Sequence, residues 1–235
     1  MRVIVSMTSH PGRNGMQGPT LKSLIEQERK ADEIWLTLPP GCVMAALPPG
    51  ERWVENRFRV SMPGFDRGPI MKLGALLAKD SEHAPEHAPD DLIITVDDDI
   101  VYKPTWLAAL VAAAESYPDD ALGFSGWDVD KFLAGTGRYR FKSAPSACDV
   151  LEGWSGAAYR RRFFDGVDIF DVPPVYKFVD DVWISSRLHR RGITRRLIAT
   201  PTAFVSNPYP GGSGLHTRYD FIEMNRLAAI DGFSS

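Results

Sequence analysis

Three consecutive carboxylates, Asp97, Asp98 and Asp99, follow the apolar run 92–96. A short apolar run rich in β-branched residues predicts a strand that is buried on both faces of a parallel sheet. Like charges this close repel one another, and a divalent cation is the usual compensation beside an apolar core. Open α/β sheets also bind ligands outside the carboxyl ends of their strands. The same residues suit a solvated turn or a cap for the helix after Pro104, and the tripeptide alone favours neither interpretation.

The geometry of an extended chain divides these carboxylates, because alternate side chains point to opposite sides. Asp97 and Asp99 are expected on one side and Asp98 on the other. Carboxylate oxygens suit Mg²⁺ or Mn²⁺, which keep coordination positions open for substrate phosphates. The sequence contains no Gly-Lys-Ser/Thr phosphate loop and no Gly-x-Gly-x-x-Gly turn after its first strand. A metal would therefore carry the phosphates, helped by Lys72 or Arg13.

A second acidic pair, Asp180 and Asp181, opens a predicted helix over 180–191. Carboxylates in the first turn of a helix are stabilised by its dipole, and Asp180 is predicted to cap the helix. For Asp181 a second interpretation competes with the cap. Apolar neighbours raise the pKa of a carboxylate, which suits it to accept a proton from a hydroxyl as a general base.

Between the acidic groups lies the segment 151–159, which contains several small residues and Trp154. Small residues let a ligand approach the backbone, and the tryptophan could stack on a sugar ring. Taken by its residues alone, the segment favours a tight turn with a core tryptophan. His216 follows a glycine-rich run and is a lone histidine, for which a structural or exposed position is the usual interpretation. A third metal ligand delivered by a closing loop is the alternative.

The first half of the chain alternates predicted strands with predicted helices, which is typical of a parallel α/β sheet. The expected strands are 2–7, 33–38, 57–60, 91–96 and 121–127, and the expected helices are 19–30, 70–79 and 104–116. Residues 128–147 are predicted to form a long surface loop or a hairpin. The elements expected after it are a helix at 180–191, strands at 194–199 and 202–205, and a helix at 219–230.

Composition places the chain among ordinary globular proteins. It has 235 residues, 44% of them hydrophobic and 24% charged, and a net charge of −3. The charge gives no sign of nucleic-acid binding, and two cysteines provide neither a disulfide framework nor a metal-ligand spacing. We expect one domain, 1–235, with functional halves at 1–127 and 128–235.

Three surface features complete the sequence pattern. Residues 82–89 repeat a proline-containing unit, so His83 and His87 are not a helical metal pair, and the segment is predicted to be an exposed loop. Eight arginines between Arg160 and Arg196 are expected to form a mostly solvated face. No apolar run is long enough for a membrane span. The prediction is a cytoplasmic protein, with peripheral membrane contact through the arginines as an alternative.

Together these pieces resemble a glycosyltransferase of the GT-A fold, close to the family 2 type. The resemblance covers most of the chain and rests on the order and spacing of its motifs. They are Thr8–Arg13 after the first strand, Leu24–Gln27, Gly68–Leu73, Asp97-x-Asp99, Gly153–Tyr159 and Asp180-Asp181. The implied architecture is an α/β fold with a Rossmann-like, mostly parallel central sheet flanked by helices.

The resemblance implies a nucleotide-diphosphosugar donor, either a UDP- or a GDP-sugar. Thr8, Ser9 and Arg13 would line the nucleotide pocket, and Lys72 would lie near the ribose or diphosphate. Asp97, with Asp98 beside it, would serve the ribose or sugar side. By the family pattern, the Mn²⁺ or Mg²⁺ ligands would be Asp99 and the late histidine, His216.

On the acceptor side, Asp181 matches the base of inverting members, and Asp180 replaces the more usual glutamate. Trp154, Ser155 and Gly156 would join Asp180 in binding a glycan, lipid-linked or other small hydroxyl acceptor. The Gln/Arg-x-x-Arg-Trp motif of processive synthases is missing from the sequence. This absence implies single transfers.

Three other classes share parts of the pattern. A metal-dependent nucleotidyltransferase also uses carboxylates at strand ends, but the sequence lacks a glycine-rich N-terminal loop with a trailing lysine. A metal-dependent phosphoesterase suits the aspartate triplet, although the histidines are sparse. A non-catalytic carbohydrate-binding domain would use Trp127, Trp154 and the tyrosines without needing Asp181.

Overall fold

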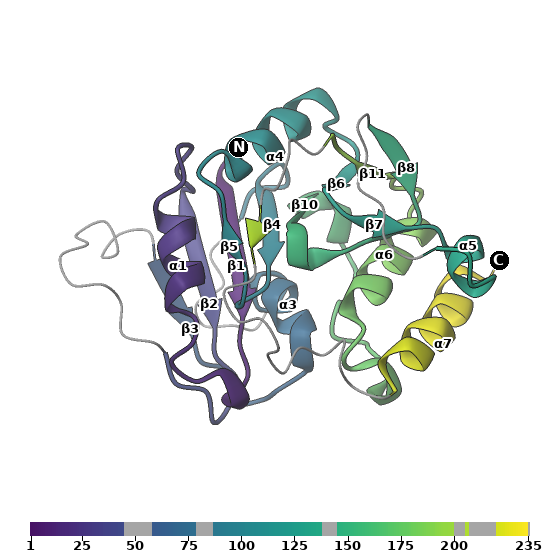
Figure 1. Ribbon diagram of the computed structural model, residues 1–235, viewed down its shortest axis with the longest axis horizontal. Helices are drawn as coiled ribbons and strands as arrows, with labels where there is room; N and C mark the ends of the chain where they lie inside the picture. The colour runs from purple at the N-terminus through teal and green to yellow at the C-terminus, as the bar shows by residue number, and fades with distance from the viewer. Residues whose placement is uncertain (45–57, 79–86, 138–144, 200–204, 207–219, 235) are drawn as a thin grey trace.

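A computed structural model describes residues 1–44, 58–78, 87–137, 145–199, 205–206 and 220–234. Its centre is an eight-stranded sheet with the order β3-β2-β1-β4-β10-β6-β11-β8 (Figure 1). These strands are β1 (Val3–Thr8), β2 (Glu33–Thr37), β3 (Phe58–Ser61), β4 (Leu92–Val96), β6 (Ala121–Gly123), β8 (Ser146–Cys148), β10 (Ala157–Arg160) and β11 (Arg195–Leu197). The sheet therefore combines strands from both halves of the chain.

The first four strands of the sheet are parallel to one another, as the alternating sequence pattern predicts. β10 runs antiparallel to β4 and β6, its neighbours on either side, and β11 is parallel to β6. Edge strand β8 is antiparallel to β11. Two short pairs lie outside the sheet: β5 (Val101–Tyr102) with β12 (Val205–Ser206), and β7 (Gly126–Trp127) with β9 (Val150–Leu151).

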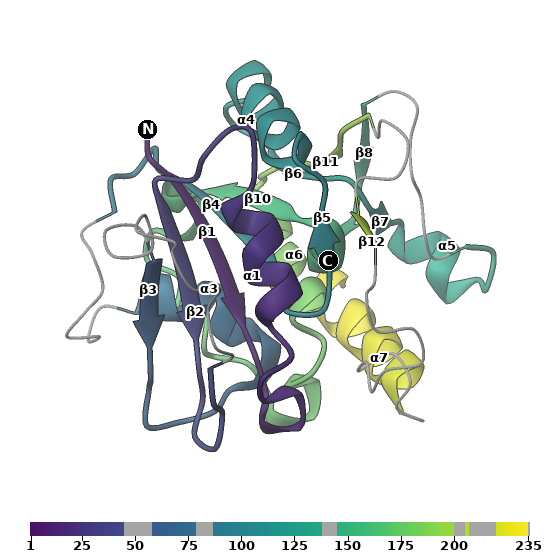
Figure 2. The same ribbon diagram turned by 60° about the vertical axis from the view of Figure 1, so that its left-hand side comes forward.

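Helices cover both faces of the sheet (Figure 2). On one face, α1 (Gly18–Ile25) and α4 (Trp106–Ser116) share a core with alternate residues of β1, β2 and β4. On the other, α3 (Met71–Leu77) and α6 (Asp180–Arg190) pack against the intervening residues. Burial on both faces explains why residues 92–96 form a continuous apolar run. Among the residues that the structure describes, no helix is both long enough and apolar enough to cross a bilayer.

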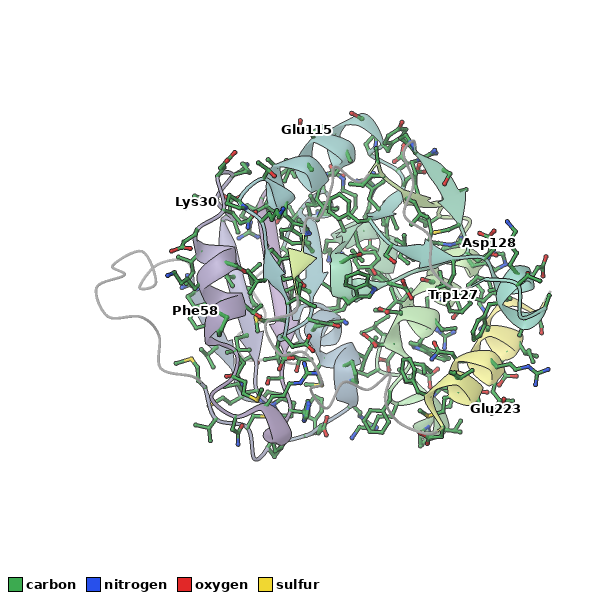
Figure 3. All side chains as sticks on the ribbon, viewed as in Figure 1. Lys30, Phe58, Glu115, Trp127, Asp128 and Glu223 are labelled. Carbon is green, nitrogen blue, oxygen red and sulfur yellow. The ribbon has the colours of Figure 1, made fainter. Side chains whose placement is uncertain are left out.

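A third core lies beyond the sheet. It is formed by α5 (Val129–Leu133), α7 (Phe221–Phe233), the β7–β9 pair and one side of α6. Trp127, where the two predicted halves meet, is buried in this core and lies beside α7 in Figure 3. The prediction of a long surface loop or a hairpin over 128–147 is therefore wrong at its start, where α5 packs its apolar side chains.

Several predicted boundaries also change. The predicted strand 121–127 is broken at Phe124 and Ser125 into β6 and β7. The first helix ends at Ile25 and not near Lys30. Gln27 is buried just beyond it, where its side-chain amide donates to the carbonyls of Tyr102 and Lys103. This amide ties α1 to the segment that leads into α4.

Strand β10 was not predicted from the sequence, because the segment 151–159 was expected to form a tight turn. The turn is confined to η3 (Gly153–Ser155) and Gly156, and the following four residues form a central, fully buried strand. Alanines have low strand propensity, and burial on both faces leaves no alternation to recognise. The fold class itself is confirmed as α/β, with a mostly parallel central sheet flanked by helices.

Candidate active site

The carboxylates of residues 97–99 lie in the turn between β4 and β5. The predicted position at the carboxyl end of a central strand is correct. The chain is not extended here, however, so simple alternation does not set the side-chain directions. Asp97 pairs with Lys72, whereas Asp98 and Asp99 share Arg13 as their partner.

Asp98 anchors the loop that follows β1. Its carboxylate is buried and accepts a hydrogen bond of 2.5 Å from Ser9 Oγ, while its other oxygen pairs with the Arg13 guanidinium. Gln17 Nε2 donates in turn to Ser9 Oγ at 2.9 Å, and Thr20 Oγ1 donates to the Asp98 carbonyl at 3.0 Å. The predicted nucleotide-side residues Ser9, Arg13 and Asp98 are thus brought together.

Asp99 retains an excess of negative charge around it. Arg13 Nη2 lies 2.8 Å from Asp99 Oδ2. Burial nevertheless raises the pKa of Asp99, and the neighbouring charge of Asp97 raises it further. Burial alone would lower the pKa of Arg13, but Asp98 and Asp99 outweigh that effect and raise it. Additional positive charge beside Asp99 would be stabilising.

Lys72 joins the two acidic groups. Its Nζ lies 2.9 Å from Asp97 Oδ1 and 3.0 Å from Asp180 Oδ2, and only 4% of its side chain is exposed. Burial alone would lower the pKa of Lys72, but Asp180 and Asp97 outweigh it and raise the pKa well above its usual value. The ammonium therefore stays charged. α3 presents it at the site because the helix buries Leu73 and Leu76 elsewhere.

Asp180 does not cap its helix, contrary to the sequence prediction. α6 begins at Asp180 itself, and the preceding Val179 occupies the N-cap position without a side-chain hydrogen bond. The Asp180 carboxylate is buried beside Lys72 instead. Burial raises the pKa of Asp180, and the nearby ammonium opposes that rise.

Asp181 has the environment expected of a base. Its Oδ1 accepts a hydrogen bond of 3.0 Å from the Gly153 N–H. Burial raises the pKa of Asp181 well above its usual value, and the charge of Asp180 raises it further. A raised pKa improves the match between a carboxylate and the proton of a hydroxyl group.

Two glycines in the turn before β10 allow close approach, one by Lys72 and Asp181 and the other by Trp106. A side chain at Gly153 would begin 2.9 Å from Lys72 Nζ and 3.0 Å from Asp181 Oδ1. Gly156 has φ +100°, and a Cβ there would lie 2.4 Å from the Trp106 ring. Close approach of the backbone, which the small residues indicated, is therefore present, although the groups that approach are the protein's own.

Two buried aromatic residues fix this turn against the carboxylates. Tyr102 donates its hydroxyl to the Trp154 carbonyl at 3.0 Å and accepts a hydrogen bond of 3.2 Å from the Asp97 N–H. Trp106 Nε1 donates to the Ser155 carbonyl at 2.8 Å. Sequence interpretation missed both residues, because an aromatic residue in an apolar segment carries no sign of such a hydrogen bond.

The remaining predicted residues have these positions. Thr8 Oγ1 donates to the Thr37 carbonyl at 3.0 Å, at the ends of β1 and β2. Trp154 is half-buried beside the site, whereas the Ser155 side chain is buried and donates to the Glu152 carbonyl. His216 lies outside the described residues.

The carboxylates of the site are the candidate ligands for a divalent metal ion. Within the described ranges, no group of three or more His, Cys, Asp or Glu side chains is arranged to hold one. The carboxylates nevertheless outnumber the cations among them: Asp97, Asp98, Asp99, Asp180 and Asp181 face Arg13 and Lys72. This excess, and the raised pKa of Asp99, fit an oxygen-bound cation such as Mg²⁺ or Mn²⁺.

No protein-family model and no curated protein sequence matches this chain, whereas solved structures do. S. aureus TarS 1–349 matches with a TM-score of 0.59 at 17% identity, over 98% of this chain and 65% of that one. The same fragment in complex with UDP-GlcNAc gives 0.59 at 14% identity, over 98% and 66%. GalNAc-T7 with UDP, GalNAc and Mn²⁺ gives 0.57 at 13% identity, over 84% and 42%.

The chain has the GT-A glycosyltransferase fold. The expected resemblance is confirmed at the level of architecture. This chain spans about two thirds of the length of the TarS fragments and less than half of GalNAc-T7.

Two other predictions about this GT-A chain hold only in part. Residues 82–89 were expected to form an exposed loop. Ala88 and Pro89 are exposed, but the His87 side chain is buried against Trp35, with Glu33 3.7 Å from its Nε2, and residues 82–86 lie outside the described ranges. The eight arginines were expected to be mostly solvated. Six of them are exposed or half-buried, whereas Arg160 and Arg195 are buried, with their guanidinium groups donating to main-chain carbonyls.

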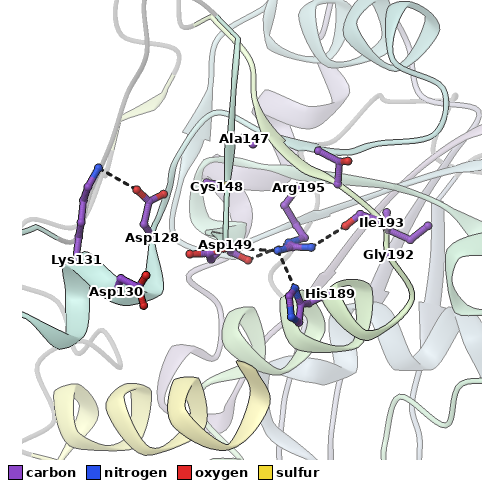
Figure 4. A pocket seen from close by; sticks show the side chains of 11 residues that line it. Asp128, Asp130, Lys131, Ala147, Cys148, Asp149, His189, Gly192, Ile193 and Arg195 are labelled. Carbon is purple, nitrogen blue, oxygen red and sulfur yellow. Dashed lines mark hydrogen bonds and ion pairs between the residues drawn. The ribbon is translucent and has the colours of Figure 1, made fainter. Parts of the chain in front are cut away.

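A pocket of about 570 Å³ lies away from the carboxylates of the candidate site. It is lined by α5, β8 and the segment joining α6 to β11 (Figure 4). Arg195 extends across it and donates to the carbonyls of Asp149 and Ile193 at 3.0 and 2.7 Å. None of the predicted site residues lines this pocket. The internal hydrogen bonds indicate a structural role for the arginine.

Proposed function

We propose that this chain is a metal-dependent glycosyltransferase that moves one sugar at a time, with inversion, from a nucleotide-diphosphosugar to an acceptor hydroxyl. The observation that carries the proposal is the Lys72 bridge. It holds a donor-side carboxylate, Asp97, and the neighbour of a candidate base, Asp180, within 3.0 Å of the same ammonium. The bridge therefore brings the donor-side carboxylates and the candidate base into one site, as orientation of the reactants for direct displacement requires.

On the donor side, Thr8, Ser9, Arg13, Lys72, Asp97 and Asp98 would bind the nucleotide and sugar, and Asp99 with His216 would hold Mn²⁺ or Mg²⁺. When bound, such an ion supplies charge stabilisation to a departing diphosphate. Arg13 holds Asp98 and Asp99 in place before the donor arrives. Lys72 adds a second fixed cation beside the leaving group.

On the acceptor side, Asp181 accepts the proton of the attacking hydroxyl. The oxygen forms a bond to the anomeric carbon as the bond from that carbon to the diphosphate oxygen breaks, and the diphosphate leaves with the electron pair. Attack from the face opposite the diphosphate inverts the anomeric centre. The Gly153 N–H fixes one oxygen of Asp181 and leaves its carboxylate oriented for the transfer.

The acceptor binds along the turn before β10, with Asp180 and residues 154–156 around it. Trp154 offers an aromatic surface at the edge of the core. A sugar acceptor presents an apolar ring face and hydroxyl edges, which match an indole beside a carboxylate pair. We propose residues 1–127 as the donor half and residues 128–235 as the acceptor half.

Incubation with a panel of nucleotide sugars and Mn²⁺ tests this function. Slow release of nucleoside diphosphate, accelerated by a carbohydrate acceptor, is the expected result. Release of pyrophosphate in a parallel incubation with a nucleoside triphosphate and a sugar 1-phosphate would instead identify a nucleotidyltransferase. Sugar binding without turnover by any donor would favour a binding domain and contradict the proposal.

A further inference from the structure

Glu152 is a buried carboxylate next to the candidate base, and the chemistry above gives it no role. It is 4% exposed. Its Oε2 accepts hydrogen bonds from Ser125 Oγ at 2.5 Å and from Trp154 Nε1 at 3.3 Å. Its backbone N–H donates to the Ser125 carbonyl at 3.0 Å. The side chain is thus fixed to the break between β6 and β7, where the predicted single strand is interrupted.

The turn that Glu152 begins serves both components of the acceptor site. Its carboxylate holds the edge of the Trp154 indole, and the next residue, Gly153, donates its N–H to Asp181 at 3.0 Å. The Trp154 carbonyl is held in turn by Tyr102. Three consecutive residues therefore fix an aromatic surface and a base relative to each other. This turn can position an acceptor only if both the Trp154–Glu152 and the Gly153–Asp181 hydrogen bonds are kept.

Resting on the proposed function, we propose that Glu152 is a positioning residue for transfer to a carbohydrate acceptor. Its carboxylate orients the Trp154 indole for stacking on the acceptor ring, and its place next to Gly153, which binds Asp181, puts a negative charge in the surroundings of the base. A buried carboxylate is costly unless it is hydrogen-bonded, and both of the donors described here come from side chains that would otherwise lose a partner.

Glu152 is one of several groups whose charge acts on Asp181. It is among the carboxylates that raise the pKa of this residue, although burial and Asp180 contribute more. Besides Asp180 on the same helix, the groups that face Asp181 from other elements are Lys72 on α3, Asp97 after β4 and Tyr159 on β10. Removing the charge of Glu152 leaves all of these in place.

Glu152→Gln separates the two roles. The glutamine oxygen still accepts from Trp154 and Ser125, but the negative charge is gone. We expect the acid limb of the pH profile of kcat/KM to move to lower pH. With one negative charge fewer around it, Asp181 has a lower pKa and releases its proton more readily. The KM for the acceptor should stay within about twofold of wild type, because the hydrogen bond from the Trp154 indole is kept.

Trp154→Phe tests the orientation role without changing a buried charge. It should raise the KM for a carbohydrate acceptor about two- to tenfold, the range expected for a lost hydrogen bond, and leave the acid limb unmoved. Ser125→Ala is the matched control, because it removes a donor to Glu152 but keeps the tryptophan contact. It should change the acceptor KM less than Trp154→Phe does.

An active wild-type enzyme whose Glu152→Gln variant keeps the wild-type acid limb overturns the charge role. An unchanged acceptor KM in Trp154→Phe overturns the orientation role, even if Glu152→Gln does not fold. Both results leave the proposed function standing. A wild-type protein that transfers no sugar overturns the proposed function and the role of Glu152 with it.

Discussion

The two acidic groups of the site contain the same residue type in opposite electrostatic settings. In the turn at residues 97–99, each carboxylate lies beside Lys72 or Arg13. In the pair at the start of α6, Lys72 binds Asp180, while Asp181 receives a main-chain N–H and the repulsion of its neighbour. Asp97 and Asp98, each paired with a cation, suit an anchor, whereas Asp181, whose pKa is raised by burial and by Asp180, suits a base. The surroundings therefore separate roles that the sequence letters do not.

Removing the cation shared by both groups should have the largest effect. Lys72→Met leaves Asp180 buried without its ammonium, which typically costs about 3 to 5 kcal/mol of unfolding free energy for a broken buried pair. Transfer should fall by at least about 100-fold, because the donor also loses a fixed positive charge. Urea unfolding and initial transfer rates measure the two effects.

Lys22→Met is the matched control for that substitution. Lys22 lies on α1, exposed and 3.7 Å from Glu26, where a surface pair contributes about 1 kcal/mol or less. If Lys72→Met behaved like this control in both measurements, Lys72 would not connect the two groups.

Metal removal should affect the first acidic group and leave the second intact. Chelation is expected to lower transfer by at least about 100-fold, since a bound ion supplies several kcal/mol to the departing diphosphate. Mn²⁺ or Mg²⁺ added back should restore the rate. Full activity in excess chelator would show that Arg13 and Lys72 provide the whole of the compensating charge.

Weakening the anchor alone should change donor binding more than chemistry. Arg13→Gln removes the guanidinium from Asp98 and Asp99, and a charged hydrogen bond is typically worth about 1.5 to 3 kcal/mol. The KM for the nucleotide sugar should rise about tenfold or more, with a smaller change in kcat. Arg29→Gln, at an exposed residue 4.0 Å from Asp32, is the control and should leave both constants near wild type.

The pH profile tests the base with the smallest perturbation. Asp181 must be ionised to accept a proton, and burial raises its pKa. Activity should therefore be lost on acidification at a higher pH than the value of about 3.9 for an unperturbed aspartate. An acid limb at or below that value in kcat/KM would contradict the assigned environment of Asp181.

The sequence predicted those parts of the fold that have a clear period or a strong local signal. The buried strand before Asp97, the helix that begins at Asp180 and the parallel first half all follow from apolar patterning. The motif order also placed both acidic groups at one site, where Lys72 joins them. Local patterning is sufficient where one element alone decides the outcome.

Features that depend on contacts between distant segments escaped prediction. β10 has no alternating pattern because it is covered on both faces. The Lys72–Asp180 pair and the Glu152–Ser125 hydrogen bond join residues that only the folded sheet brings together. The burial of His87 beside Glu33 has the same origin. In these three pairs a polar residue gains a partner that no local spacing in the sequence indicates.

Replacement of the candidate base tests the whole account most directly. Asp181→Asn keeps an oxygen for the Gly153 N–H and removes the negative charge. We predict that transfer is abolished while calorimetry gives nearly wild-type nucleotide-sugar binding. Because the folded state raises the pKa of Asp181, its ionised form disfavours folding at neutral pH, and the variant should melt no lower than wild type. Normal turnover by Asp181→Asn would contradict the assignment of the base.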